Sequence, residues 1–469
     1  MGMGANPSRR PWFHEPMNAI DELLARLPAG VVLRDAAAME KYRFDWTHEV
    51  SAGNPLAVIR AESAEQVQVA VRWAAQHRVP VVPRGAGTGL SGGSSAVEGG
   101  IVVCLERMAA VEIDVESRVA VVEPGALNAA VKAAAAAHGL WYPPDPASFE
   151  ICSIGGNLAT NAGGLCCVKY GVTTDYVLGM DVVLADGTLV TLGGKRIKDV
   201  AGLSLLKLFV GSEGTLGIIT RALLRLVPAQ PPRSTMVATF ATVQDAADAV
   251  VAIGGRLRAS MMELMDNTTI NAVEDYQPMG LDRSAGALLL AQSDAPGEAR
   301  AIEIAAMAEQ CEKQQALEVF VTDDPAEGDL FVQARRMVFP AVEARGSTMH
   351  EDVGAPVPML PVLLAEVSRL AAAYDLEIPV VAHAGDGNTH PIIVYDASRP
   401  GAEERARACF DEIMSAAIRL GGTITGEHGV GRAKKGKLAE QLGGDVMALN
   451  RRVKAALDPD GILNPGAIW

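Results

Sequence analysis

The sequence predicts a two-domain protein of the α+β class, and three observations lead to that prediction. In the first half, a glycine-rich stretch lies between two apolar runs that have the length and composition of buried strands. In the second half, strand-like and helical stretches follow in the order β-α-β-β-α-β, which is typical of a ferredoxin-like fold. A segment with Pro228, Pro231 and Pro232 separates the two halves.

The glycine-rich stretch is the strongest local signal in the chain. The run Val79–Val82 predicts a strand, and five glycines follow in the nine residues from Gly85 to Gly93. Glycine lets backbone N–H groups approach a ligand and point into one concavity, which is how such loops bind phosphate. Arg84 adds a positive charge. A tight turn without a ligand is the alternative interpretation.

The residues after the glycines argue against a Rossmann phosphate loop. That motif rests the pyrophosphate on the N-terminus of a helix that begins at the glycines. Here residues 94–100 are polar and rich in glycine, and Ile101–Leu105 is another apolar run. We therefore expect a strand, a phosphate-binding loop and a second strand.

The residues before the loop complete a β-α-β unit. Ala57–Arg60 predicts a strand, and Ser63 begins a capping-box pattern at the start of a helix that ends near His77. Residues 1–50 are expected to form an N-terminal arm with one helix, Ala19–Arg26, and no role in chemistry.

Two further regions of the first half have the composition of a binding surface. Tyr142–Ser148 is rigid because of its prolines, and Ser153–Gly164 is a stretch of small residues that offers many backbone donors to a large flat ligand. Gly211–Gly217 is a third glycine-bearing stretch. We expect residues 51–228 to form one ligand-binding domain and residues 229–469 to form a second domain.

Composition argues against several classes of function. The net charge of −15 opposes nonspecific binding to nucleic acid. No run of 18 apolar residues predicts a membrane-spanning helix, and residues 1–12 lack the apolar core of a signal peptide. Six cysteines at irregular spacing indicate reduced thiols, so we expect a cytoplasmic protein.

Two histidine-bearing clusters are the chemical signal of the second half. His383 and His390 bracket a glycine-rich segment after the apolar run Ile378–Val381, and Glu427 and His428 lie in a second glycine turn. Two imidazoles and one carboxylate can bind a metal and leave coordination positions open, as a catalytic site requires. A structural role for each residue is the alternative interpretation.

Arg335 and Arg336 are candidates for binding a carboxylate. An arginine fork pairs bidentately with a carboxylate, which fixes its orientation as well as its charge. A solvent-exposed helix face is the alternative, and we expect it to be right for one of the two residues.

Together these motifs resemble the FAD-binding domain of the vanillyl-alcohol-oxidase superfamily. The resemblance rests on Pro83–Gly93, Ser153–Gly164 and Gly211–Gly217, and it runs from about residue 50 to the C-terminus. Within the superfamily the chain is similar to the FAD-linked group of D-lactate dehydrogenase, D-2-hydroxyglutarate dehydrogenase and the FAD-binding component of glycolate oxidase. This implies a two-subdomain FAD-binding domain of the PCMH type and a ferredoxin-like substrate-binding cap.

The resemblance implies that the first loop holds the FAD pyrophosphate, while the second and third regions line the adenosine and the flavin. The last segment is implied to return to the flavin. Covalent members carry a His or Cys near the flavin; neither occurs within Arg84–Gly93, so we expect noncovalent FAD. The implied cofactor-binding residues are Arg84, Gly85, Ala86, Gly87, Thr88, Gly89, Leu90, Ser91, Pro144, Asp145, Ser148, Gly155, Gly156, Asn157, Ala159, Asn161, Gly163, Gly164, Glu213, Gly217, Ile218 and Asn464.

The polar clusters also receive roles from the resemblance. It implies His383, His390 and Glu427 as ligands of a divalent metal, and both zinc and manganese suit these donors. His428 is implied as the general base, and Arg335 as the group that holds the substrate carboxylate. The implied reaction transfers a hydride from C2 of a D-2-hydroxy acid to flavin N5 and yields the 2-oxo acid.

Departures from the family pattern bear on the substrate. The usual Trp before Arg335 is missing, with Phe331 and Val332 near its place. His350 stands where D-2-hydroxyglutarate dehydrogenases carry a Lys that contacts the distal carboxylate, and Pro391 stands where they carry an Asn. The last two departures argue against a dicarboxylate, so we expect D-lactate or glycolate as the substrate.

The electron acceptor and the partners stay open at this point. The chain is either a dehydrogenase that reduces a quinone, a cytochrome or an electron-transfer flavoprotein, or an oxidase that passes electrons to oxygen. A third alternative is the catalytic component of a glycolate oxidase complex with several subunits. Since the chain has no CxxC cluster, an iron–sulfur centre would then lie on a partner subunit. We expect a homodimer, with peripheral binding to the inner membrane as an open alternative.

Overall fold

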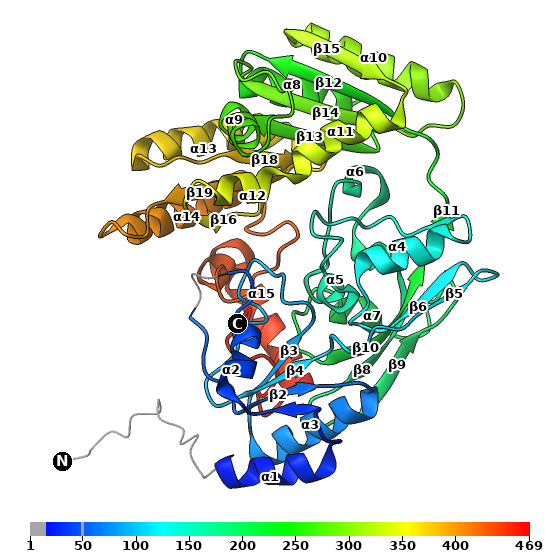
Figure 1. The fold of residues 1–469 in the computed structure, drawn as a ribbon, viewed down its shortest axis with the longest axis vertical. Coiled ribbons are helices and arrows are strands. Elements are labelled where there is room, and N and C mark those ends of the chain that lie inside the picture. The colour runs from blue at the N-terminus through cyan, green and yellow to red at the C-terminus, as the bar shows by residue number, and fades with distance from the viewer. Residues whose placement is uncertain (1–15, 48–50) are drawn as a thin grey trace.

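The computed structural model describes residues 16–47 and 51–469, which form two bodies stacked along the long axis of the molecule (Figure 1). The lower body contains the first half of the chain, and the upper body contains a large sheet with its helices. The described residues do not include 1–15 and 48–50. The expected start of the arm and the argument about a signal peptide concern these residues.

A four-stranded sheet forms the base of the lower body. Its order is β1-β2-β4-β3, and β2, β4 and β3 are parallel. The strands are β1 (Val32–Leu33), β2 (Ala57–Arg60), β3 (Val81–Arg84) and β4 (Ile101–Cys104). Helix α3 (Ala64–His77) joins β2 to β3, with Ser63 as its N-cap, and β3 leads to β4 without a helix. The expected strand, loop and strand are therefore present.

The N-terminal residues pack onto this sheet. Helix α1 (Pro16–Arg26) lies against α3, and β1 pairs with β2 in antiparallel orientation. Helix α2 (Ala36–Met39) and the short helix η1 (Glu40–Tyr42) follow. The helix expected at Ala19–Arg26 is present and begins at Pro16.

A five-stranded antiparallel sheet forms the other half of the lower body, in the order β5-β6-β10-β8-β9. Its strands are β5 (Val111–Asp114), β6 (Val119–Val122), β8 (Val177–Val183), β9 (Leu189–Gly193) and β10 (Ile218–Arg225). The elements around it are α4 (Asn128–Ala136), β7 (Leu140–Trp141), α5 (Ile154–Thr160), α6 (Cys167–Tyr170), η2 (Thr173–Tyr176), α7 (Leu205–Phe209) and β11 (Val227–Pro228).

The region Ser153–Gly164, expected as a binding surface of small residues, contains a short helix. It begins with helix α5, whose first turn is capped by the Ser153 side chain, which accepts a hydrogen bond from the Gly156 N–H. The helix ends at Asn161, which has a φ of 54°. Glycine weakens a helix interior, but a cap at each end makes a helix of this length acceptable.

The upper body is built on an eight-stranded antiparallel sheet in the order β15-β12-β14-β13-β18-β19-β16, with β17 paired to β19. The strands are β12 (Ser234–Phe240), β13 (Met261–Asp266), β14 (Ala287–Ser293), β15 (Glu318–Thr322), β16 (Ser347–His350), β17 (Val353–Gly354), β18 (Val380–His383) and β19 (Asn388–Tyr395). With α8 (Val243–Gly254) and α10 (Ala299–Lys313), strands β12 to β15 form the expected ferredoxin-like arrangement.

Helices cover both faces of this sheet. Helices α8, α10, α13 (Leu360–Tyr374) and α14 (Ala402–Arg419) share one apolar core with it. Helices α9 (Asn267–Tyr276), α11 (Pro325–Arg336) and α12 (Val338–Glu343) share a second core. Successive residues of β13 alternate between the two cores, which places the cores on opposite faces.

One segment, Val357–Tyr374, is long and apolar enough to cross a membrane by length and composition alone, although no such segment was expected from the sequence. It comprises the short helix η3 (Val357–Met359) and helix α13. Helix α13 packs against α14 and α8, and its Leu363 and Leu364 belong to the core of the upper body.

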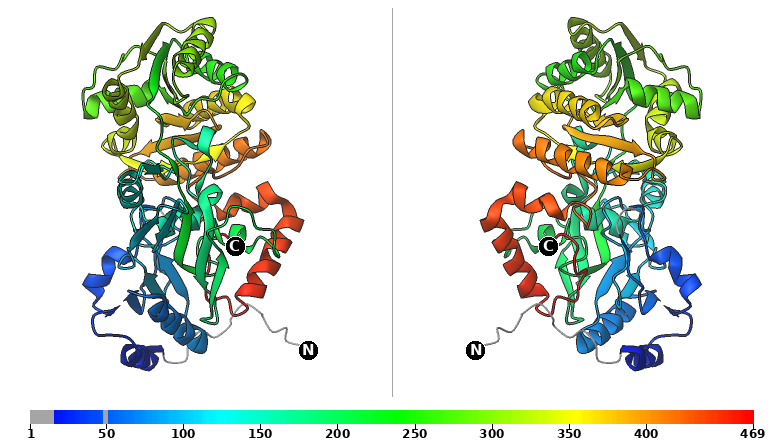
Figure 2. Two further views of the ribbon diagram at one scale, coloured as in Figure 1. Left: turned by 90° about the vertical axis from the view of Figure 1, so that its right-hand side faces the viewer. Right: turned by 90° about the vertical axis from the view of Figure 1, so that its left-hand side faces the viewer.

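The last part of the chain returns to the lower body. Helix α15 (Lys435–Leu457) lies on the flank of that body, with a break at Gly443 (Figure 2). The segment after it runs beside β3, where the Val81 N–H donates to the Ile462 carbonyl over 2.8 Å. The Asn464 N–H in turn donates to the Val81 carbonyl over 2.7 Å. The C-terminal segment thus lies next to β3, which leads into the glycine-rich loop.

Candidate active site

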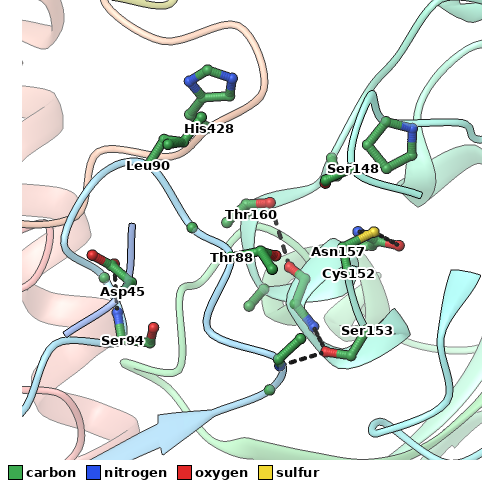
Figure 3. Close-up of a pocket in the computed structure, with 18 of the residues that line it drawn as sticks. Asp45, Thr88, Leu90, Ser94, Ser148, Cys152, Ser153, Asn157, Thr160 and His428 are labelled. Atoms are coloured by element: carbon green, nitrogen blue, oxygen red, sulfur yellow. Dashed lines mark hydrogen bonds between the residues drawn. The ribbon is translucent and has the colours of Figure 1, made fainter. Parts of the chain in front are cut away.

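A cavity of about 530 Å³ lies between the two bodies and is lined by both of them. The glycine-rich loop after β3 forms one wall, and the segment 146–162 around α5 forms the wall opposite (Figure 3). Residues from α11, β18, β19 and the turn after α14 close the end toward the upper body. A cavity of this volume is typical of a site for a cofactor or small ligand.

The glycine-rich loop offers backbone donors to this cavity. The N–H groups of Gly87, Thr88 and Gly89 donate no hydrogen bond to any described residue. Arg84 is buried, and its Nη2 donates to the Lys41 carbonyl over 3.2 Å while Nη1 has no partner among the described residues. Unpartnered N–H groups beside a guanidinium form a site for an anion such as a phosphate.

The opposite wall is fixed by hydrogen bonds among small polar side chains. The Ala86 N–H donates to Ser153 Oγ over 3.1 Å, which connects the loop to the start of α5. Asn157 accepts a hydrogen bond from Asn128 Nδ2 over 3.0 Å. Figure 3 shows Thr88 and Leu90 of the loop across the cavity from Ser148. These hydrogen bonds connect the wall to the loop and to α4 without a ligand.

Most of the residues expected to bind the cofactor line the cavity, and several do not. Those in the lining are Arg84, Gly85, Ala86, Gly87, Thr88, Gly89, Leu90, Ser91, Ser148, Gly155, Gly156, Asn157, Ala159, Glu213, Gly217 and Ile218. Pro144, Asp145, Asn161, Gly163, Gly164 and Asn464 lie outside the lining. Gly163 and Gly164 instead line a second cavity of about 450 Å³, which reaches His383 and Glu427 from another side.

Three of the expected cofactor-binding residues form hydrogen bonds that hold neighbouring segments together. They are Asn464, Glu213 and Asp145. Asn464 Nδ2 donates to the carbonyls of Gly93 and Glu213 over 2.8 and 2.7 Å, which ties the C-terminal segment to the loop. The Glu213 carboxylate accepts hydrogen bonds from the N–H groups of Val430 and Gly431. Asp145 accepts a hydrogen bond from the Cys166 N–H over 3.1 Å.

The three residues expected to bind a metal meet at the upper end of the cavity. His383 is the last residue of β18, His390 lies in β19, and Glu427 lies in the turn after α14. Glu427 Oε1 lies 3.2 Å from His383 Nε2 and 3.4 Å from His390 Nε2. Their candidate ligand atoms all lie within 4.8 Å of one another, a spacing that a single metal ion could bridge.

The charges around this cluster favour a cation. Burial alone would raise the pKa of Glu427, but the neighbouring His383 and His390 outweigh it and hold that pKa well below its usual value. Burial alone would lower the pKa of His383, but Glu263 and Glu427 raise it well above its usual value. A buried site with this excess of negative charge needs a proton or a metal ion for neutrality.

His428 lies beside the cluster and faces the same cavity. Its ring stacks on that of His390, with centroids 5.0 Å apart, and its Nε2 lies 3.9 Å from Glu427 Oε1. Burial lowers the pKa of His428 to about 4, so the imidazole is neutral near pH 7. A neutral imidazole at this place can accept a proton from a ligand in the cavity.

Arg335 lies at the end of α11 with its side chain 1% exposed. Its Nε donates to Glu263 Oε2 over 2.6 Å, while Nη1 and Nη2 have no partner among the described residues. Arg336 also lines the cavity, and its guanidinium stacks on Phe149 at 4.6 Å. Of the two arginines, Arg335 is therefore the one whose unpartnered fork is buried.

Comparison with known proteins identifies the family. Residues 229–468 match the family described as "FAD linked oxidases, C-terminal domain", and residues 55–193 match "FAD binding domain". The chain belongs to the FAD-linked oxidases. It is 40% identical over 431 residues to "Glycolate oxidase subunit GlcD" of Bacillus subtilis, which covers 91% of this chain and 92% of that protein.

Two further relatives extend the comparison. The chain is 36% identical over 438 residues to the D-lactate dehydrogenase of Archaeoglobus fulgidus, which covers 92% of this chain and 95% of that protein. Its fold is similar to that of p-cresol methylhydroxylase with bound substrate, with a TM-score of 0.80, 20% identity and 96% of each chain covered. The resemblance and the fold class that the glycine motifs indicated are thereby confirmed, and the protein is an FAD-dependent oxidoreductase.

The cavity of this FAD-linked oxidase fits its cofactor. A Cβ atom added at Gly89 would meet only Asp45 Oδ2, at 3.5 Å, so the space in front of this backbone is open. The open space adjoins the free N–H groups and Arg84, which suit the charge of a pyrophosphate. The length of the cavity beyond them is lined by small residues of α5, as a flat ring system requires.

Sequence reasoning missed three acidic residues at this site. Glu263 of β13 contacts both Arg335 and His383. Asp352 Oδ2 accepts hydrogen bonds from the N–H groups of Glu427 and His428 over 3.0 and 2.8 Å and so fixes their turn. Asp45 lines the cavity from the segment that was expected to carry no chemistry. A single carboxylate inside the apolar run of β13 was the available signal for Glu263.

Proposed function

We propose that this FAD-linked oxidase oxidises a small D-2-hydroxy acid, of the D-lactate or glycolate class, to the corresponding 2-oxo acid. The observation that carries the proposal is the free, buried fork of Arg335 in one cavity with His428 and the His383–His390–Glu427 cluster. The names of the relatives from Bacillus subtilis and Archaeoglobus fulgidus, a glycolate oxidase subunit and a D-lactate dehydrogenase, support the same class.

Each side chain has a defined part in this reaction. The two terminal nitrogens of Arg335 bind the substrate carboxylate, because a buried fork without a partner gains most from a bidentate anion. His428 accepts the hydroxyl proton as the general base. His383, His390 and Glu427 hold a divalent metal, zinc or manganese, which supplies Lewis acidity toward the hydroxyl oxygen. Noncovalent FAD supplies the hydride acceptor.

The shape of the cavity near Arg335 favours a small substrate. The ring of Phe339 lies 6.2 Å from that of His390 and forms an apolar wall beside the cluster. His350, at the position where a dicarboxylate-specific relative carries a Lys, packs against Phe339 with ring centroids 5.4 Å apart and does not line the cavity. A second substrate carboxylate would therefore find no basic side chain at position 350.

The remaining assignments are parts of the same proposal. Residues 51–228 form the FAD-binding domain, and residues 229–469 form the substrate and metal domain with its last segment returning to the flavin. The chain is cytoplasmic and forms a homodimer, and it passes electrons to a quinone, a cytochrome or an electron-transfer flavoprotein. An iron–sulfur partner subunit belongs to the alternative of a glycolate oxidase complex, which the similarity to the glycolate oxidase subunit of Bacillus subtilis favours.

The decisive experiment is anaerobic reduction of the bound flavin. Purified protein is mixed with D-lactate, L-lactate, glycolate, D-malate and D-2-hydroxyglutarate, and the absorbance of oxidised flavin is followed. We expect bleaching by D-lactate or glycolate and little by L-lactate or the dicarboxylates. Absence of bleaching with every D-2-hydroxy acid would refute the proposal. Oxygen uptake by the single chain then indicates an oxidase, and dye reduction without oxygen uptake indicates a dehydrogenase. A chain that shows neither activity alone is a subunit that depends on its complex.

A further inference from the structure

Glu263 occupies an unusual position for a carboxylate. It lies in the middle of β13, between Met262 and Leu264, and is 1% exposed. In the antiparallel pair of β13 with β18, it is the direct cross-strand partner of His383. Its side chain points to the face that also receives Met261 and Met265, which α11 helps to cover. A charge buried at this depth requires partners.

The first partner of Glu263 is the candidate metal ligand His383. His383 Nδ1 lies 2.8 Å from Glu263 Oε1 and 3.0 Å from Oε2. An ionised carboxylate only accepts, so Nδ1 must be the donor. In the neutral ring this leaves the Nε2 lone pair free, and Nε2 is the atom 3.2 Å from Glu427 Oε1. Glu263 thus selects the tautomer that can bind a metal through Nε2.

The second partner is the candidate substrate clamp Arg335. Its Nε donates to Glu263 Oε2 over 2.6 Å. Because the guanidinium is planar, a hydrogen bond at Nε fixes the plane in which Nη1 and Nη2 lie. Those two nitrogens are the buried donors without a partner among the described residues. One carboxylate therefore orients both the fork and the imidazole.

We propose that Glu263 is a positioning residue that couples the substrate clamp to the metal site. Through His383 it sets the ligand tautomer, and through Arg335 it sets the direction of the carboxylate-binding fork. The inference rests on the proposed function. It adds that one residue, Glu263, determines both the affinity for the metal and the affinity for the substrate. A purely structural role for the buried ion pair is the competing explanation, and it predicts lost stability with no specific loss at either site.

The test compares Glu263→Gln with three other single variants, and with the double variant Glu263→Gln/Arg335→Ala, in the FAD-loaded protein. Glu274→Gln is the matched control, because Glu274 is also buried in the upper body and accepts hydrogen bonds from the Met279 and Leu281 N–H groups, away from the cavity. Arg335→Ala removes the clamp alone. Glu263→Asp keeps the charge on a shorter side chain and serves as the second variant if Glu263→Gln does not fold.

The first readout is metal affinity without turnover. Metal is stripped with a chelator, and Zn²⁺ is titrated back calorimetrically. Loss of a carboxylate that orients a ligand typically weakens metal binding about 10–100-fold, so we expect this loss in Glu263→Gln. Arg335→Ala and Glu274→Gln should bind Zn²⁺ like the parent. Glu263→Asp should fall between the parent and Glu263→Gln.

The second readout is the steady-state kinetics of D-lactate or glycolate oxidation with metal in excess. Glu263→Gln should raise KM, and the increase should not add to that of Arg335→Ala, because both act through the same fork. Parent-like Zn²⁺ affinity in Glu263→Gln would overturn the inference while leaving the proposed function intact. A parent protein that binds no Zn²⁺ or Mn²⁺ would refute both the metal site and the coupling. Equal losses in Glu274→Gln would assign the effect to stability and also overturn the inference.

Discussion

The glycine-rich loop and the side-chain cluster at the upper end of the cavity are two walls that present different kinds of chemistry. The loop Arg84–Gly93 presents backbone N–H groups, and its chemistry is contained in one short stretch of sequence. The cluster at the upper end presents side chains that come from β18, β19 and the turn after α14. Ligand binding by the loop relies on backbone groups that glycine leaves uncovered. Ligand binding by the cluster relies on the side chains of its residues.

The two walls also differ in what holds them in place. The Ser91 carbonyl accepts hydrogen bonds from the N–H groups of Arg432 and Ala433, and the Gly93 carbonyl accepts one from Asn464, so distant segments fix the loop. The side-chain cluster is held by buried acids, Glu263 and Asp352, at its back. Substitutions in the loop should therefore affect cofactor content, whereas substitutions in the cluster should affect chemistry with the cofactor still bound.

Metal removal should produce the largest effect, a loss of activity at the cluster without a loss of FAD from the loop. A chelator should abolish turnover, because His383, His390 and Glu427 would lose the ion that acts on the hydroxyl group, while FAD stays on the other wall. Activity and flavin absorbance are measured before and after dialysis against the chelator, and again after Zn²⁺ or Mn²⁺ is restored. Active protein without stoichiometric metal by elemental analysis would contradict this prediction.

Removal of the proposed base, His428, should cause the second-largest loss of activity. His428→Ala should lower the rate of flavin reduction about 10²–10⁴-fold, the usual cost of losing a general base, with FAD content unchanged. Stopped-flow absorbance under anaerobic conditions measures this step directly. His138→Ala, a change at an exposed histidine, is the control and should reduce its flavin at the parent rate. A parent-like rate in His428→Ala would remove His428 from the role of base.

The contrast between the walls explains how far the sequence could predict the site. The chemistry proposed for the loop is local, so the glycines from Gly85 to Gly93 and the missing helix after them were sufficient to propose it. His383, His390 and Glu427 stood out because glycine turns with scarce histidines are unusual. Their meeting in space depends on pairing of β18 with β19 and on the return of the turn after α14, which spacing alone does not determine.

The residues that sequence reasoning missed share one physical reason. Glu263 lies in β13, and its role appears only through the cross-strand pair with His383. Asp352 acts through the backbone of Glu427 and His428, a contact across many residues of chain. Asn464 was expected to face the flavin, yet its side chain lies outside the cavity lining and binds two carbonyls. Long-range hydrogen bonds of this kind leave no pattern in the sequence.

A glycine substitution tests the backbone wall without disturbing the fold. Gly87 is unsuitable, because its φ is 78° and an added Cβ would lie 2.0 Å from Arg84 Nη2. At Gly89 an added Cβ meets only Asp45, so Gly89→Val should fold but fill the space proposed for the pyrophosphate. We expect FAD affinity to fall about 10–100-fold, since each charge-assisted hydrogen bond lost costs about 1.5–3 kcal/mol.

The measurement is FAD content after gel filtration, followed by titration of the apoprotein with FAD. Gly254→Ala, in α8 with no atom within 4 Å of the added Cβ, is the matched control and should retain full FAD. A Gly89→Val protein with parent-like FAD affinity would place the pyrophosphate away from this loop.

The last prediction concerns the pH dependence of stability and rests on Glu213, which links the two walls. Its carboxylate accepts hydrogen bonds from the N–H groups of Val430 and Gly431 over 2.7 and 2.8 Å, next to the turn that carries Glu427. Burial raises the pKa of Glu213 from 4.5 to about 7 and outweighs these two hydrogen bonds, which act in the opposite direction. The folded protein therefore holds this proton more tightly than the unfolded chain does.

The sign of the resulting pH dependence follows from linkage. A carboxyl group with a raised pKa contributes stability that is fully present below its unfolded value near 4.5. That stability is lost as the pH rises to about 7. At about 1.4 kcal/mol per pKa unit, the parent should lose up to about 3 kcal/mol relative to Glu213→Gln across this window, since Gln does not ionise. Thermal unfolding of both FAD-loaded proteins from acid to neutral pH measures the difference. A difference that instead grew in favour of the parent as pH rose would show that the ionised carboxylate, held by Val430 and Gly431, is the preferred form.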